Sequence, residues 1–152
     1  MNEIHCLSSA QVVLEYSESK IAKFERRDCV VRALAAFCEI SYDVSHKFCK
    51  DVFKRRNKQG VYATEAQLGV FLKENKNTLF GKEVKTLTNN FTYYGSTKRQ
   101  MTLLSFIRKH SKGFYMIFVR GHALVLKNGI LIGNANEHKH LRRRVEIAYK
   151  IK

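Results

Sequence analysis

The sequence predicts an α+β protein made of one domain. Segments with the apolar spacing of helices lie within the first 113 residues, and apolar runs typical of strands follow them. The chain has 152 residues, of which 45% are hydrophobic, which suits one domain with one sizeable core. We therefore expect N-terminal helices packed on a C-terminal antiparallel sheet, within a single domain over residues 1–152.

The helical part begins after a polar segment. Residues 1–20 contain the short apolar run VVLEY and are predicted to form an N-terminal arm or an edge strand. Val30, Ala33, Leu34 and Phe37 recur at helical spacing, which predicts a central, largely buried helix over about residues 29–40. Further helices are expected over residues 41–57, 63–75 and 101–113, the first of these with its inner face on residues 44, 48 and 52.

The strands follow in close succession. FYMIFVRG predicts one strand, and HALVLKNGILIGNAN predicts two strands joined at Asn128 and Gly129, a strong hairpin signal. RRRVEIAYKIK alternates apolar and polar residues and would close the sheet. Residues 76–100 are polar and mixed, and their pattern assigns no element.

The composition is strongly basic. Lys and Arg number 28 against 13 Asp and Glu, a net charge of +15, which attracts nucleic acid or acidic proteins. Two clusters are candidates for contacts with nucleic acid or an acidic partner, although an exposed helix end and a solvated loop explain them equally well. They are Lys54, Arg55 and Arg56, and Arg142, Arg143 and Arg144.

Several classes of protein are disfavoured. The four cysteines form no CxxC pair, and no Cys and His pair has zinc-finger spacing, so we expect no metal and no cofactor. The N-terminus lacks the pattern of a signal peptide, and no apolar run approaches the roughly 18 residues that cross a bilayer. We expect free thiols in a reducing compartment and no membrane association.

Cys29 is the candidate nucleophile. It lies at the predicted start of the helix over 29–40, next to unpaired backbone N–H groups and the positive end of the helix dipole. Both features stabilise a thiolate, and the backbone N–H of Cys29 itself can point at a developing oxyanion. Cys38 lies on the apolar face of the same helix and Cys49 near that of the next, as expected of core residues.

His122 is the candidate base, and its partner depends on the hairpin turn. A three-residue turn pairs Leu126 with Ile130 and places Asn134 opposite His122, where the amide can orient the imidazole. A two-residue turn pairs Lys127 with Ile130 and turns Asn134 to the other face of the sheet. A thiol, an imidazole and an orienting group together form the machinery of thiol acyl transfer.

The two motifs resemble a known family when taken together. RRDCVVRALA and, about 80 residues later, KGFYMIFVRGHALVLKNGILIGN are similar to small papain-like proteins of tailed bacteriophages, and distantly to the double-glycine peptidase domains of bacteriocin exporters. The resemblance spans roughly residues 26–134. It implies a papain-like fold and a cysteine peptidase with the catalytic residues Cys29, His122 and Asn134, located in the host cytoplasm or the virion.

The sequence departs from that family at the oxyanion hole. Papain-like peptidases usually carry a Gln five or six residues before the Cys, and Phe24 and Lys23 occupy these positions here. Losing one such donor costs on the order of 100-fold in rate. Two hypotheses therefore stand: a thiol peptidase or acyl hydrolase that cleaves a peptide or isopeptide bond, and a catalytically inactive papain-like scaffold that binds a virion protein or nucleic acid.

Overall fold

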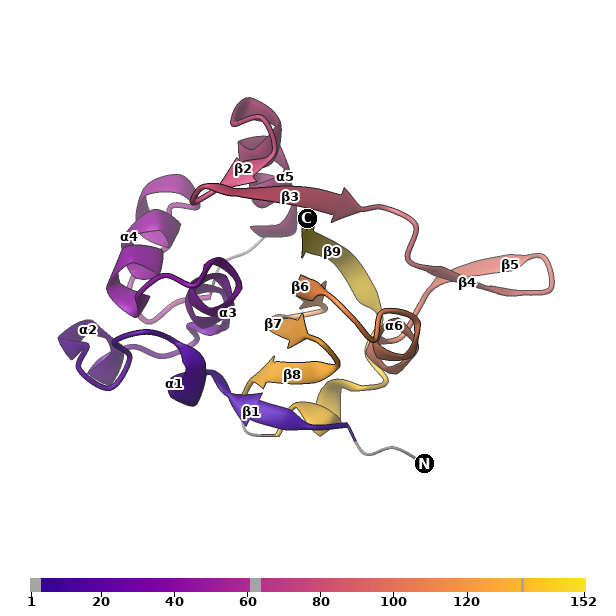
Figure 1. Cartoon of the computed structure of the whole chain (residues 1–152), viewed down its shortest axis with the longest axis horizontal. Coiled ribbons are helices and arrows are strands. Elements are labelled where there is room, and N and C mark those ends of the chain that lie inside the picture. The colour runs from indigo at the N-terminus through magenta and orange to yellow at the C-terminus, as the bar shows by residue number, and fades with distance from the viewer. Residues whose placement is uncertain (1–3, 61–63, 135) are drawn as a thin grey trace.

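The computed structural model describes residues 4–60, 64–134 and 136–152 and shows a mixed α+β architecture. Its main sheet has seven strands in the order β1-β8-β7-β6-β9-β3-β2. Helices α3, α4 and α5 lie on one side of this sheet in Figure 1, and α6 lies on the other. The predicted α+β class is therefore confirmed.

The helices are shorter than predicted, and additional ones lie near the N-terminus. The helix that begins at Cys29 ends at Cys38, and the helix after Ser41 ends at Val52. Their bounds are α1 Ser9–Val12, α2 Lys20–Lys23, α3 Cys29–Cys38, α4 Tyr42–Val52, α5 Thr64–Glu74 and α6 Leu103–Lys109, with a 3-10 helix η1 at Glu137–His140.

The strands begin before the C-terminal third, which corrects the predicted layout. Cys6–Ser8 forms an edge strand that runs parallel to β8, and the unassigned segment 76–100 contains four strands. Two of these strands extend the sheet beyond β9, and the other two form the hairpin that projects from the body in Figure 1. The bounds are β1 Cys6–Ser8, β2 Thr78–Leu79, β3 Lys82–Leu87, β4 Phe91–Tyr94, β5 Thr97–Gln100, β6 Phe114–Val119, β7 His122–Lys127, β8 Ile130–Gly133 and β9 Val145–Ile151.

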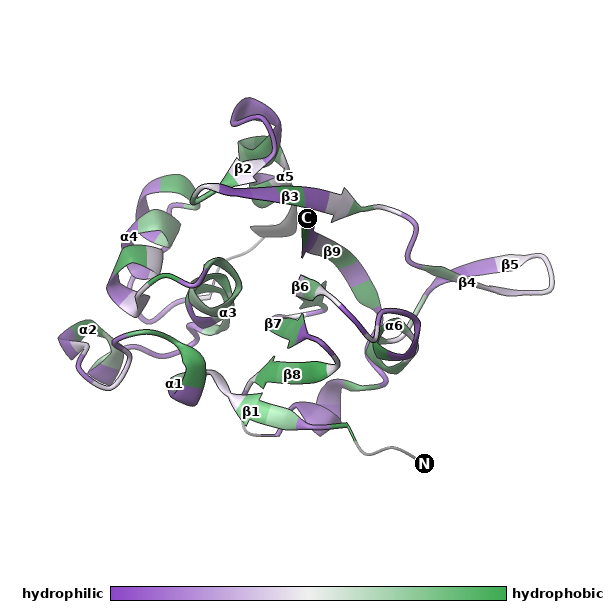
Figure 2. Cartoon of the chain, in the orientation of Figure 1, coloured by the Kyte–Doolittle hydropathy of each residue, from purple (hydrophilic) through white to green (hydrophobic). Residues whose placement is uncertain are grey.

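Side-chain alternation along the central strands builds two apolar cores. Met116 and Phe118 of β6 pack with α3 on one face, while Ile117 and Val119 pack with α6 on the other. Both faces of β6, β7 and β8 are therefore apolar, as Figure 2 shows. This burial holds the start of α3 and the start of β7 in fixed positions.

Helix α4 buries only part of the predicted face: Phe48 and Val52 pack against the core as predicted, and Val44 does not. Val44 is 47% exposed, whereas Tyr42 and Cys49 are fully buried. Ser45 is buried as well, and its hydroxyl donates a hydrogen bond to the carbonyl of Val31, which joins α4 to α3. The buried face extends beyond the predicted residues because the hydrogen-bonded Ser45 also lies on it.

Candidate active site

Cys29 occupies the first position of α3, as the sequence predicts. The helix is buried along most of its length, and Asp28 is its N-cap residue but makes no capping hydrogen bond. The Asp28 carboxylate instead accepts a 2.7 Å hydrogen bond from the hydroxyl of Tyr42. The backbone N–H groups at the start of α3 therefore have no side-chain acceptor from the cap.

The structure brings His122 to Cys29, about 90 residues along the chain. His122 is the first residue of β7, and its imidazole lies beside the Cys29 thiol, where it lowers the pKa of that thiol. Both residues line one small cavity together with Ser9 and Asn134. The nucleophile and base predicted from the sequence are therefore neighbours in space.

The partner of His122 is Glu137, a residue that the sequence analysis missed. Nε2 of His122 lies 3.0 Å from each carboxylate oxygen of Glu137, which is fully buried. Because Nε2 is bound to this carboxylate, Nδ1 is the ring nitrogen left for the thiol. Thiol, imidazole and carboxylate thus form a chain of three groups.

Asn134, the predicted third member, contributes to the site through its backbone. The hairpin turn has two residues, with positive φ at both Asn128 and Gly129, and Lys127 pairs with Ile130. This register removes the amide of Asn134 from the position opposite His122. Its backbone N–H instead donates a hydrogen bond to Glu137 Oε1, at 2.5 Å.

The position of Glu137 depends on a glycine. A Cβ atom at Gly133 would lie 2.5 Å from Glu137 Oε1, so any larger residue there would displace the carboxylate. A sequence signal for Glu137 existed, because it is the one acidic residue between His122 and Glu146 in a strongly basic segment.

The electrostatics of the three groups favour a charged thiol–imidazole pair. Burial raises the pKa of the Cys29 thiol, but the hydrogen bond and the charge of His122 lower it more, so the pKa lies below the ordinary value. Burial lowers the pKa of His122, but its bonds to Cys29 and Glu137 raise it to about 9. These shifts favour a protonated imidazole between the thiol and the Glu137 carboxylate, whose pKa is lowered in turn despite its burial.

His140 packs against this pair. Its ring stacks on that of His122 with the centroids 4.5 Å apart. Burial and the charge of His122 lower its pKa, so we expect it to be neutral at pH 7. Its Nε2 lies 3.8 Å from Glu137 Oε2, which is beyond hydrogen-bond distance.

The same side chains could also bind a metal ion. His122, Glu137 and His140 each place one ligand atom so that all three lie within 4.8 Å of one another. Imidazoles and a carboxylate are ligands that zinc accepts. Because Nε2 of His122 and the carboxylate already bind each other, a metal would have to replace that hydrogen bond.

The cavity beside Cys29 is small and contains an unpaired hydroxyl. It measures about 10 Å³, the space of about one water molecule. Ser9, the first residue of α1, is fully buried there, and its Oγ has no hydrogen-bond partner. Phe24, one of the two positions at which the sequence analysis looks for an oxyanion Gln, is 73% exposed.

The predicted basic clusters separate into structural and exposed residues. Arg55 is buried, with its Nη1 2.6 Å from Glu25 Oε2, which corrects its assignment as a binding residue. Lys54 and Arg56 beside it are exposed. Arg142, Arg143 and Arg144 line a surface pocket.

The fold and site together define a protein with a buried thiol–imidazole–carboxylate arrangement on an α+β scaffold. Comparison with models of known protein families, with curated proteins and with solved structures found no match to this chain. Among the residues that the structure describes, no helix has both the length and the hydropathy needed to cross a membrane.

Proposed function

We propose that this protein is a papain-like thiol peptidase or acyl hydrolase that cleaves a peptide or isopeptide bond, in keeping with the resemblance to phage proteins. The observation that carries the proposal is the arrangement of Cys29, His122 and Glu137, in which the thiol and the imidazole line one cavity and the imidazole is hydrogen-bonded to the carboxylate. Its third member is Glu137 in place of the expected Asn134. A carboxylate in this position holds the imidazole in one orientation and stabilises its protonated form.

The reaction follows from these positions. The Cys29 thiolate attacks the carbonyl carbon, and the resulting oxyanion accepts hydrogen bonds from the backbone N–H of Cys29 and from Ser9 Oγ. Protonated His122 then donates its proton to the leaving amine, which breaks the C–N bond and leaves a thioester on Cys29. Neutral His122 removes a proton from water, which attacks the thioester and releases the acid and the thiol.

The proposal is tested by the relative reactivity of the cysteines. We expect iodoacetamide at pH 6.5 to alkylate Cys29 well before the other thiols, because only thiolates react. Burial raises the pKa of Cys38 and of Cys49 to about 12, and burial also raises that of Cys6. Peptide mapping by mass spectrometry after timed alkylation measures each rate.

Equal rates at Cys29 and Cys6 would contradict the nucleophile assignment. Cleavage itself is measured by incubating the protein with a library of peptides and identifying new termini. The Cys29→Ala variant is the control, and cleavage that persists in it comes from another source.

The tightness of the site favours a second candidate function. A cavity that holds about one water does not admit a peptide carbonyl and its neighbours unless the elements around it move. The alternative is therefore a papain-like scaffold that binds an acidic protein or nucleic acid without cleaving it. An unreactive Cys29, together with the absence of library cleavage, would favour that alternative.

Ser9 is the expected second donor of the oxyanion hole. We predict that Ser9→Ala lowers the rate of cleavage of a library-derived peptide by about 100-fold, while the alkylation rate of Cys29 stays unchanged. Removing a buried hydroxyl without a partner should leave the melting temperature equal or higher. Ser8→Ala is the matched control, because Ser8 only caps the short α1 helix. A Ser9→Ala variant that cleaves at the wild-type rate would refute the assignment.

A further inference from the structure

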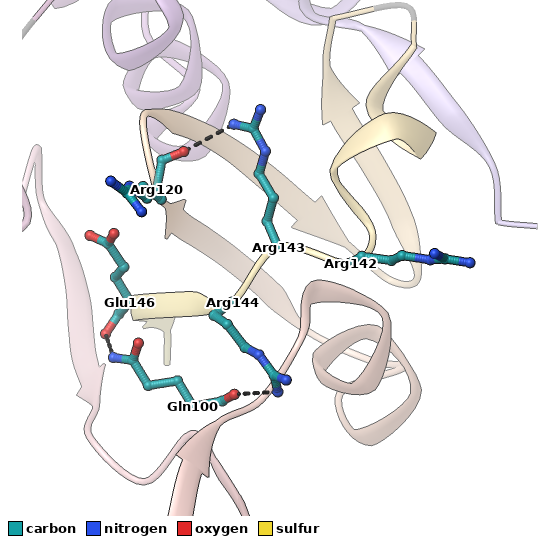
Figure 3. Close-up of a pocket in the computed structure, with 6 residues that line it drawn as sticks. All are labelled: Gln100, Arg120, Arg142, Arg143, Arg144 and Glu146. Atoms are coloured by element: carbon teal, nitrogen blue, oxygen red, sulfur yellow. Dashed lines mark hydrogen bonds between the residues drawn. The ribbon is translucent and has the colours of Figure 1, made fainter.

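An arginine-lined pocket lies beside the candidate active site. It measures about 580 Å³ and is far larger than the cavity at Cys29. Figure 3 shows its side chains, which come from the end of the β4–β5 hairpin, the β6–β7 turn and the segment that enters β9. The lining residues are Gln100, Arg120, Arg142, Arg143, Arg144 and Glu146.

Backbone contacts hold part of this pocket in place. Arg143 Nη1 donates to the carbonyl of Arg120 at 3.0 Å, and Arg144 Nη1 donates to the carbonyl of Gln100 at 2.9 Å. These bonds hold two guanidinium groups in fixed orientations, and each guanidinium has further N–H donors. Arg120 is exposed, and its guanidinium makes no hydrogen bond to the described residues. Part of the conformational entropy that these side chains would lose on binding a ligand is therefore already lost in the free protein.

The pocket and His122 lie at the same end of the central strands. Val119, at the end of β6, pairs with His122 of β7 on one side and with Val145 of β9 on the other. Two strand spacings of about 4.8 Å therefore separate His122 from the start of β9, or roughly 10 Å. An extended peptide covers that distance in about three residues at roughly 3.3 Å each.

The chemistry of the lining favours anionic groups. The lining contains four arginines and one glutamate, so the pocket attracts anions, and a guanidinium group binds a carboxylate through two parallel hydrogen bonds. Proteins that hold single-stranded nucleic acid add aromatic side chains on which bases stack. No aromatic residue is among the described residues that line this pocket, and the exposed Tyr93 and Tyr94 lie elsewhere on the hairpin.

We propose that this pocket receives the acidic side chains of a peptide substrate, about three residues from the bond that Cys29 attacks. The inference rests on the proposed function, and it adds a substrate class to it. Acidic residues near the cleaved bond would then be a specificity requirement of the enzyme.

The experiment measures binding in the Cys29→Ala variant, which cannot turn a substrate over. The probes are fluorescein-labelled octaglutamate, octaglutamine and an eight-nucleotide thymidine strand, followed by anisotropy at 150 mM salt. We expect octaglutamate to bind best and its affinity to fall at least about tenfold when Arg120→Ala and Arg143→Ala are combined. The matched control combines Lys54→Ala with Arg56→Ala, which removes the same charge from an exposed site far along the chain and should leave binding within about twofold.

Two results would overturn the inference. One is an equal loss of octaglutamate affinity in both double variants, which would mean that net charge alone attracts the peptide. The other is tighter binding of the thymidine strand with the same dependence on Arg120 and Arg143, which would identify a nucleic-acid site.

Alkylation of wild-type Cys29 separates this inference from the proposed function. Octaglutamate should slow alkylation by at least about threefold in the wild type and have no effect in the Arg120 and Arg143 double variant, since only a peptide held in the pocket shields the thiol. A reactive Cys29 with no such binding refutes the pocket assignment alone. Arginine-dependent octaglutamate binding with an unreactive Cys29 supports the pocket as a binding site for acidic peptides and refutes the peptidase.

Discussion

Replacing His122 with Ala should reduce the alkylation rate of Cys29 at pH 6.5 by at least about tenfold. Burial raises the pKa of this thiol, and the hydrogen bond and charge of His122 are what bring it below the ordinary value. Without the imidazole only burial and the weaker contacts remain, so the thiolate fraction at pH 6.5 falls by tenfold for each unit of pKa gained. The rate is measured with iodoacetamide from pH 5 to 10, where the midpoint of the profile should move upward.

The same assay distinguishes the two candidates for the third member. Glu137→Gln removes the carboxylate that helps to raise the pKa of His122 to about 9, so the imidazolium should lose its proton at lower pH. Asn134→Ala is the control, since the contact of this residue with Glu137 runs through its backbone N–H. We expect the peptide cleavage rate to fall by about 100-fold or more in Glu137→Gln and to change by less than about threefold in Asn134→Ala. The reverse order would restore Asn134 as the orienting residue.

Replacing Arg55 with Ala should lower the free energy of unfolding by about 3–5 kcal/mol. Arg55 Nη1 and His46 Nε2 each lie 2.6 Å from Glu25 Oε2, and the Arg55 and Glu25 side chains are only 2% and 3% exposed. Removing one partner of a buried ion pair leaves the other charge buried without compensation. Urea unfolding at pH 7 measures the change. Arg56→Ala is the matched control and should stay within about 0.5 kcal/mol, because Arg56 is exposed.

The pH dependence of this pair has a defined sign. Burial raises the pKa of Glu25, but Arg55, the backbone N–H of Lys58 and His46 lower it to about 2. A pKa below the value of about 4.3 in the unfolded chain means that the contribution is present above about pH 5. It is lost as the pH falls toward about 2. The stability difference between wild type and Arg55→Ala should therefore shrink between pH 5 and 2, and a constant difference would contradict the assignment.

This ion pair also bears on the active site. Glu25 lies a few residues before Cys29, and Arg55 additionally donates to the carbonyl of Arg26 at 3.2 Å. The pair thereby fastens the segment that leads into α3 to the segment that follows α4. A variant that loosens it should perturb the position of the thiol as well as the stability of the fold.

The local features of this protein follow from its sequence alone. The apolar spacing after Cys29 predicts α3, and the Asn128-Gly129 pair predicts the hairpin, because helix periodicity and turn chemistry involve residues that are neighbours along the chain. The same local patterns predict that Cys29 begins a helix and that His122 begins a strand. These two residues carry the proposed chemistry.

Tertiary structure decided the contacts between distant residues. A change of one residue in the turn register removes Asn134 from His122, and the short η1 helix brings Glu137 to the imidazole instead. Arg55 belongs to a basic run that predicts a surface residue, but in the structure it is buried against Glu25. The edge strand β1 pairs in parallel with β8, more than 100 residues away. Charge pairing and strand pairing across such distances depend on how the elements pack. A local sequence pattern does not predict this packing.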